Sequence, residues 1–174
     1  SSAVVFIIHR IEAAITANTR LLILNSPHNP TGMVVDEDDI AALSALCAKN
    51  DIYLIGDEVY EHMVFDQAKH LSLCAYEDLY SRSFVRSSFG KTYHVTGWKV
   101  GYCVAPPDLT TEFRRVHQYV TFTVNTPVQL GIAEFLQHHP EHHQRLPGFY
   151  QAKRDLFCEL LKDSRFNVSP SQGT

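Results

Sequence analysis

The sequence predicts an α/β fold, built on a mostly parallel sheet with helices on both of its faces. Apolar runs of strand length alternate with helix-length segments through most of the chain, and several runs are apolar on both faces. The composition is typical of a globular protein, because 45% of the 174 residues are hydrophobic and 20% are charged. Taken alone, that length suits one ordinary domain.

Four segments are predicted as the strands of this sheet, each rich in aliphatic or aromatic residues and bounded by turn-forming or polar residues. They are residues 20–25, 52–57, 84–88 and 99–104. A further strand-like segment, residues 165–168, comes near the end of the chain.

Helices are predicted between these strands from their end signals. A short helix is expected to end within residues 11–17. Asp36 is expected to cap the next helix, since acidic residues fill its first turn and apolar residues form one stripe. Three more helices are expected: one capped by Asp108 and reaching about residue 122, one from Pro127 to residue 138, and one over residues 149–162.

The charge and cysteine content argue against several classes of function. A formal net charge of −4 indicates no basic surface for nucleic acid or an anionic membrane. No apolar run approaches the roughly 20 residues that span a bilayer. The four cysteines are far apart and without zinc-like spacing, so buried free thiols and a cytoplasmic location are expected. No metal site is expected, because the histidine pairs at 138–139 and 142–143 read as a solvated helix end.

Polar side chains gather at the positions where the predicted strands end. Asn29 follows the first strand, Asp57 ends the second, and Ser88 ends the third, with Lys91 three residues later. Because ligands bind outside the carboxyl ends of parallel strands, we expect these groups at one edge of the sheet. The glycine-rich motifs that bind dinucleotides or nucleoside triphosphates are absent from the sequence, so those ligands have no support.

These side chains have a common chemical function if a pyridine cofactor carrying an aldehyde binds among them. A lysine forms a Schiff base with an aldehyde, and a carboxylate facing the ring nitrogen keeps the ring protonated. Tyr60 and Asn29 can hydrogen-bond to a ring oxygen, while Ser88 and Lys99 can bind a phosphate. Each residue alone also has a structural reading, as a turn former, a packed ring or a solvated charge.

Three motifs carry a family resemblance: His-Asn-Pro-Thr-Gly at 28–32, Gly-Asp-Glu-Val-Tyr at 56–60, and Ser-Phe-Gly-Lys at 88–91, the last followed by Gly-Trp-Lys-Val-Gly at 97–101. In this order and spacing they resemble the class I/II aminotransferases, which are pyridoxal phosphate enzymes of fold type I. Residues 87–102, 117–119 and 125–127 are most similar to the subgroup of methionine and kynurenine aminotransferases.

The resemblance implies a role for each matched residue. Lys91 holds pyridoxal 5'-phosphate as a Schiff base and shuttles protons, and Asp57 pairs with the ring nitrogen. The implied catalytic residues are Lys91, Asp57 and Tyr60. The implied cofactor-binding residues are Asn29, Asp57, Tyr60, Ser88, Lys91 and Lys99. Lys99 stands where many relatives carry arginine.

The activity that the resemblance implies is a transaminase reaction, moving the amino group of a methionine-like or aromatic α-amino acid to a 2-oxo acid. These substrates and a second copy in a homodimer are the expected partners, with no nucleic acid and no membrane. Two alternatives stay open. One is a carbon–sulfur β-lyase of the same fold; the other is the aminotransferase-like effector domain of a transcriptional regulator, which needs a DNA-binding segment upstream.

The resemblance covers essentially the whole chain and implies part of a longer enzyme. Residues 1–148 are expected to form part of the cofactor-binding large domain. Residues 149–174 are expected to form a linking helix and the beginning of a small C-terminal domain. The family's substrate-carboxylate arginine and ring-stacking aromatic have no counterpart in this sequence, so this piece alone is expected to lack a complete active site.

Overall fold

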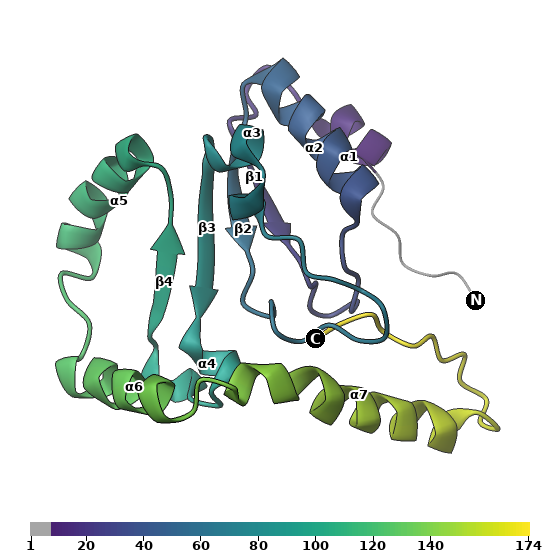
Figure 1. Cartoon of the computed structure of the whole chain (residues 1–174). Helices are drawn as coiled ribbons and strands as arrows, with labels where there is room; N and C mark the ends of the chain where they lie inside the picture. Colours follow the sequence, from purple (N-terminus) through teal and green to yellow (C-terminus); the bar gives the residue numbers. More distant parts are fainter. Residues whose placement is uncertain (1–7) are drawn as a thin grey trace.

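The computed structural model describes residues 8–174, in which four strands form one sheet with the order β1-β2-β3-β4 (Figure 1). The first three strands are parallel and the last pair is antiparallel, so the predicted mostly parallel sheet is confirmed. All four strands predicted for the sheet form: β1 (Leu21–Asn25), β2 (Tyr53–Asp57), β3 (Ser83–Ser88) and β4 (Gly101–Val104). The first seven residues of the expected large domain lie outside the described part.

One face of the sheet is covered by α2 (Glu37–Asn50), η1 (Leu73–Ala75) and α3 (Glu77–Tyr80), with α1 (Ile8–Ala14) beside α2. The predicted cap of α2 is confirmed, since the Asp36 carboxylate accepts from the backbone N–H of Asp39 at 2.9 Å in a full capping box. The core between these helices and the sheet is aliphatic, and its buried residues are Leu24, Val35, Ile40, Leu43, Cys47, Ile52, Leu54, Leu73, Leu79 and Val85.

The opposite face meets α5 (Pro107–Val120), whose Phe113 ring lies 6.2 Å from the Phe84 ring, centre to centre. Along β1 and β2 this face stays open within residues 8–174, where Leu21, Ile23 and Tyr53 are exposed. The strands therefore carry apolar residues on both faces, as parallel strands do, although the described helices cover mainly one.

Two predicted helix starts are corrected by the structure. Asp108 does not cap α5: the cap position is Pro106, and Asp108 lies inside the first turn, where its charge still complements the exposed N–H groups. Pro127 is the second residue of α6 (Thr126–His138), whose cap is Asn125. The Asn125 side chain accepts from the backbone N–H of Val128 at 3.1 Å.

The last helix also begins earlier than predicted, because α7 spans His142–Leu161 with Pro147 inside it. Buried Leu146 packs against Tyr60 and Met63, and this tertiary contact supports the turn that the proline weakens. The proposed domain boundary at residue 149 therefore falls within a helix. Residues 165–168 form no strand, since no described strand lies beside them; the nearest ladder contact is an isolated bridge between Val64 and Gly173.

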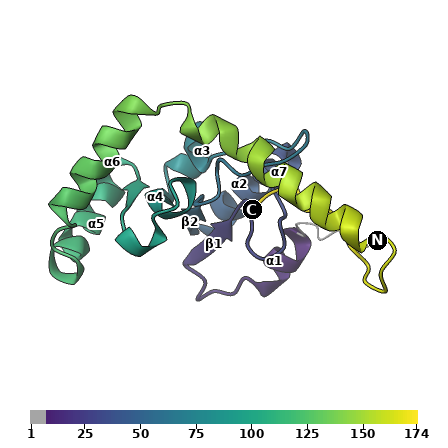
Figure 2. The ribbon, with the colours of Figure 1, turned by 90° about the horizontal axis from the view of Figure 1, so that it is seen from below.

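Helices α6 and α7 lie at the edge where β1, β2 and β3 end, as Figure 1 and the view from below in Figure 2 both show. Arg154 fastens α7 to the loop after β2, donating to the Asp66 carboxylate at 2.7 Å and to the carbonyl oxygen of Ser171 at 2.7 Å. None of the described helices is both long and apolar enough to cross a membrane.

Candidate active site

The carboxyl ends of the three parallel strands carry the residues that the sequence singled out. The strand register places Asn25 beside Asp57 and Asp57 beside Arg86. The short helix α4 (Phe89–Thr92), which contains Lys91, follows β3 directly at the same edge (Figure 1). Parallel pairing thus brings segments far apart in the sequence to one place, as expected for a sheet of this kind.

Asn29, Tyr60 and Lys91 meet at this edge. The side-chain amide of Asn29 donates to the Tyr60 hydroxyl oxygen at 2.8 Å. The Lys91 ammonium lies 5.5 Å from the centre of the Tyr60 ring, a cation–π distance. The three side chains line one cavity of about 430 Å³ together with His94 and Tyr150.

Ser88 and Lys99 lie on the other side of Lys91, and all three line a second cavity of about 810 Å³. Ser88 precedes α4, but its hydroxyl makes no capping hydrogen bond to that helix. Gly101 faces Ser88 across the β3–β4 pair, and a Cβ there would lie 2.6 Å from the Ser87 carbonyl oxygen. A glycine is therefore required for β4 to approach the Ser88 strand end so closely. Of the site residues predicted from the sequence, Lys91 is the one that lines both cavities.

Asp57 lies beside this group and lines neither cavity. Its Oδ2 atom accepts from the Arg86 guanidinium at 2.6 Å. Its Oδ1 atom is buried and has no hydrogen-bond partner among residues 8–174. Buried carboxylate oxygens are nearly always paired, so an open one indicates a place where a ligand can donate a hydrogen bond.

Asn25 is a positioning residue that the sequence reasoning did not single out. Its side-chain N–H donates to the Asp57 carbonyl oxygen at 3.0 Å, and its side-chain oxygen accepts from the Asn29 N–H at 3.0 Å. The amide therefore joins two predicted cofactor-binding residues. Its signal in the sequence is a single amide residue at the end of an apolar strand, which is too common to identify it.

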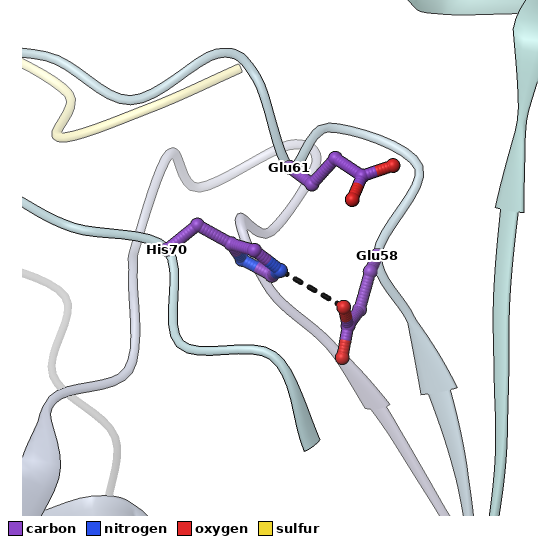
Figure 3. Close-up of side chains that lie close together, drawn as sticks. All are labelled: Glu58, Glu61 and His70. Carbon is purple, nitrogen blue, oxygen red and sulfur yellow. Dashed lines mark hydrogen bonds and ion pairs between the residues drawn. The ribbon is translucent and has the colours of Figure 1, made fainter. Parts of the chain in front are cut away.

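Two carboxylates, those of Glu58 and Glu61, lie in the turn that follows β2, and Figure 3 shows them with His70. Both oxygens of Glu58 are used: Oε1 accepts from the Leu73 N–H and Oε2 contacts the His70 ring, each at 2.9 Å. Glu61 accepts from Ser87 at 2.7 Å and from Tyr102 at 2.9 Å. Although the three side chains lie within metal-ligand reach of one another, these hydrogen bonds join them to the surrounding chain as a structural network, in which the buried His70 Nδ1 has no partner among residues 8–174.

The histidines at the start of α7 are packed, in contrast to the solvated helix end predicted from their sequence. The Nε2–H of His142 donates to the Thr92 carbonyl oxygen at 2.9 Å, next to Lys91. The His143 ring lies 4.8 Å from the His62 ring, and burial lowers the pKa of His62. His138 and His139 are exposed, as predicted. Tertiary packing of α7 against the α4 loop accounts for the difference.

The donor set fits pyridoxal phosphate, the cofactor that the resemblance implies. Lys91 offers an amine; the Asn29–Tyr60 pair offers hydrogen bonds to a ring oxygen; Ser88 and Lys99 offer a hydroxyl and a positive charge for a phosphate. The independent observation is the buried Asp57 Oδ1, whose missing partner matches the N–H of a protonated pyridine ring.

Comparison with known proteins agrees with this fit. Residues 6–174 match the family model described as aminotransferase class I and II. Methionine aminotransferase of Escherichia coli (strain K12) is 51% identical over 162 residues, which cover 93% of this chain and 42% of that protein. Kynurenine–oxoglutarate transaminase of Dictyostelium discoideum is 36% identical over 168 residues, covering 94% of this chain and 39% of that protein.

A solved structure gives the same relationship in three dimensions. The Escherichia coli protein whose crystal structure and reactivity identified a methionine aminotransferase function superposes with a TM-score of 0.91 at 50% identity. The match covers 96% of this chain and 44% of that chain, so the predicted fold type I large domain is confirmed. This chain spans about 42% of the length of the Escherichia coli relative. Because the family model matches almost from end to end, and sequence, fold and side-chain set agree, the chain belongs to the class I and II aminotransferases, whose cofactor is pyridoxal phosphate.

Proposed function

We propose that the full-length protein is a transaminase that moves the amino group of a methionine-like or aromatic α-amino acid to a 2-oxo acid, with pyridoxal phosphate attached to Lys91. The observation that carries this proposal is the position of Lys91. It lines both cavities, with the Asn29–Tyr60 pair on one side and Ser88 and Lys99 on the other. An amine between phosphate-binding and ring-binding groups is where a cofactor aldehyde needs it.

Bound there, pyridoxal phosphate supplies an aldehyde that condenses with amines and a protonated ring that accepts electrons from the substrate α-carbon. Lys91 would hold the cofactor through its Nζ amine, and the same amine, when free, would take a proton from the substrate α-carbon. Asp57, whose Oδ1 is unpartnered among residues 8–174, would accept the ring N–H. Asn29 and Tyr60 would orient the ring oxygen, while Ser88 and Lys99 would bind the phosphate.

The substrate class rests on the relatives named above, which are a methionine aminotransferase and a kynurenine–oxoglutarate transaminase. No observation within residues 8–174 favours the carbon–sulfur lyase or the effector domain of a regulator. The lyase is kept as an outcome of the experiment below, because it uses the same cofactor and the same lysine.

We also propose a homodimer in the cytoplasm. Within the described residues, large apolar side chains gather unpaired on α5 and the loop after it, which supports a protein contact there. They are Val116, Tyr119, Val120 and Phe122. All four cysteines are free, which supports a reducing compartment. Of the four, Cys47 is buried and Cys74 is exposed, so the expected burial of all four is wrong.

The decisive experiment is borohydride reduction of the full-length protein loaded with pyridoxal phosphate, followed by peptide mapping. The expected result is a cofactor-modified peptide at Lys91 that is lost in Lys91→Ala. Lys49→Ala is the matched control, because Lys49 is an exposed lysine paired with Glu12. Modification at another lysine, or none at all, overturns the proposal.

Substrate trials with the same protein then separate transfer from elimination. With methionine or phenylalanine as donor, the transaminase is expected to release the matching 2-oxo acid and leave the cofactor in its amine form. Release of pyruvate and ammonia from S-methylcysteine, without the amine form of the cofactor, would establish the lyase instead.

A further inference from the structure

Arg86 contacts Asp57, the residue proposed to bind the ring nitrogen of the cofactor. None of the proposed cofactor contacts accounts for this arginine. It is the Cα partner of Asp57 in the β2–β3 register, and its Nη2 donates to Asp57 Oδ2 at 2.6 Å. The Asp57 side chain is 16% exposed and the Arg86 side chain is 57% exposed. The carboxylate is therefore mostly enclosed and is approached from the open side by a single guanidinium.

The hydrogen bonds around Asp57 leave one atom open. Its carbonyl oxygen accepts from the Asn25 side chain at 3.0 Å and from the Ser26 N–H at 3.2 Å, which fixes the backbone. Within residues 8–174, Oδ2 is held by Arg86 and Oδ1 has no partner. A carboxylate held at one oxygen cannot turn freely about its Cβ–Cγ bond, so the Arg86 contact sets the direction of Oδ1.

We propose that Arg86 is a positioning residue, which orients the Asp57 carboxylate so that Oδ1 meets the ring N–H of the cofactor. This inference rests on the proposed function. Charge-assisted bonds from arginine are short and directional, and a binding group held in place before the ligand arrives loses less entropy on binding. Arg86 also lines the cavity formed by Ser88, Lys91 and Lys99, but its hydrogen bond is to Asp57, and the role proposed for it is exerted through that carboxylate.

The test compares full-length wild type, Arg86→Met and Arg86→Lys by titrating the apoprotein with pyridoxal phosphate. Arg86→Met is expected to raise the dissociation constant about three- to tenfold, the effect of losing one partly exposed bond to a charged group. Arg86→Lys is expected to recover part of the loss, because lysine keeps the charge but not the planar fork. Arg145→Met is the matched control: Arg145 is an exposed arginine that pairs with Glu141 at 3.3 Å, neither residue lines the two cavities, and no change is expected.

A second readout separates positioning from a general structural role. In Arg86→Met the pH midpoint of the bound cofactor's absorption is expected to move, and in Arg86→Lys to return toward wild type. A lower urea midpoint of the apoprotein with an unmoved absorption midpoint would show a structural role and overturn the inference. Equal or tighter cofactor binding by Arg86→Met also overturns it. If the wild type is not labelled at Lys91, the proposed function fails; if it is labelled and Arg86→Met binds normally, only the role of Arg86 fails.

Discussion

Replacing Glu58 by alanine is expected to destabilise the protein far more than a surface ion pair does. The Glu58 and His70 side chains are 6% and 12% exposed, and their contact is 2.9 Å long. The other Glu58 oxygen accepts from the Leu73 N–H at 2.9 Å. The buried His70 Nδ1 has no partner in the described part of the chain. The contact with Glu58 is therefore the hydrogen bond that holds the His70 ring there (Figure 3).

The size of the expected stability loss follows from the hydrogen-bonding groups that the substitution leaves without a partner. A buried N–H left without an acceptor costs about 1–3 kcal/mol, and removing one member of a buried pair costs about 3–5 kcal/mol in all. We therefore expect Glu58→Ala to lose about 3–5 kcal/mol, a large part of the roughly 5–15 kcal/mol that stabilises a typical domain. Glu58→Gln should lose less, about 1–2 kcal/mol, because the amide oxygen still accepts from the Leu73 N–H and the amide keeps a polar group beside the His70 ring.

The assay is urea unfolding of the full-length variants, followed by circular dichroism. Glu12→Ala is the matched control, because Glu12 also pairs at 2.9 Å, with Lys49, but with side chains 54% and 69% exposed. Its expected loss is below about 1 kcal/mol. If Glu58→Ala costs no more than Glu12→Ala, the argument from burial is wrong.

Three further substitutions test other contacts. Tyr60→Phe is expected to raise the dissociation constant for pyridoxal phosphate about fivefold, measured by equilibrium dialysis, because Asn29 loses the oxygen that fixes its amide. Asp36→Ala is expected to cost about 1 kcal/mol in thermal unfolding, because the carboxylate that accepts from the Asp39 N–H is lost, while the bond from the backbone N–H of residue 36 to the Asp39 side chain remains. Tyr102→Phe is expected to flatten the fall of stability above pH 10. Burial, with the Glu61 carboxylate nearby, raises the pKa of Tyr102 to about 12 from the ordinary value of 10.0, so the unfolded chain loses this proton first. The stabilisation is thus complete below about pH 10 and is lost by about pH 12, which urea midpoints across this range will show.

Each of these has a clear contrary result. Unchanged cofactor binding by Tyr60→Phe would mean that the Asn29 contact does not orient the ring oxygen. An unaltered melting temperature in Asp36→Ala would show that the start of α2 is held by packing alone. Parallel pH curves for wild type and Tyr102→Phe would show that Tyr102 titrates alike in the folded and unfolded chains.

Local patterns predicted the parts of this fold that depend on local chemistry. The four sheet strands form because their apolar runs have no other stable environment, and Asp36 caps α2 because its carboxylate reaches an N–H three residues away. Asp108 has the same signature yet lies inside α5, since Pro106 already fixes the extended turn before the helix. Residues 165–168 look like a strand, but a strand needs a neighbour, and none of the strands within residues 8–174 pairs with them.

The sequence by itself determined the family and was enough to propose the site residues, because the motifs around Asn29, Asp57 and Lys91 are each contiguous in the chain. Only the tertiary structure decided how these residues are held. Asn25 reaches Asp57 across 32 positions and Arg86 reaches it across 29. Strand register alone sets such contacts, and a shift of one residue would turn those side chains to the other face of the sheet. That is the physical reason why Asn25 and Arg86 could not be read from the sequence.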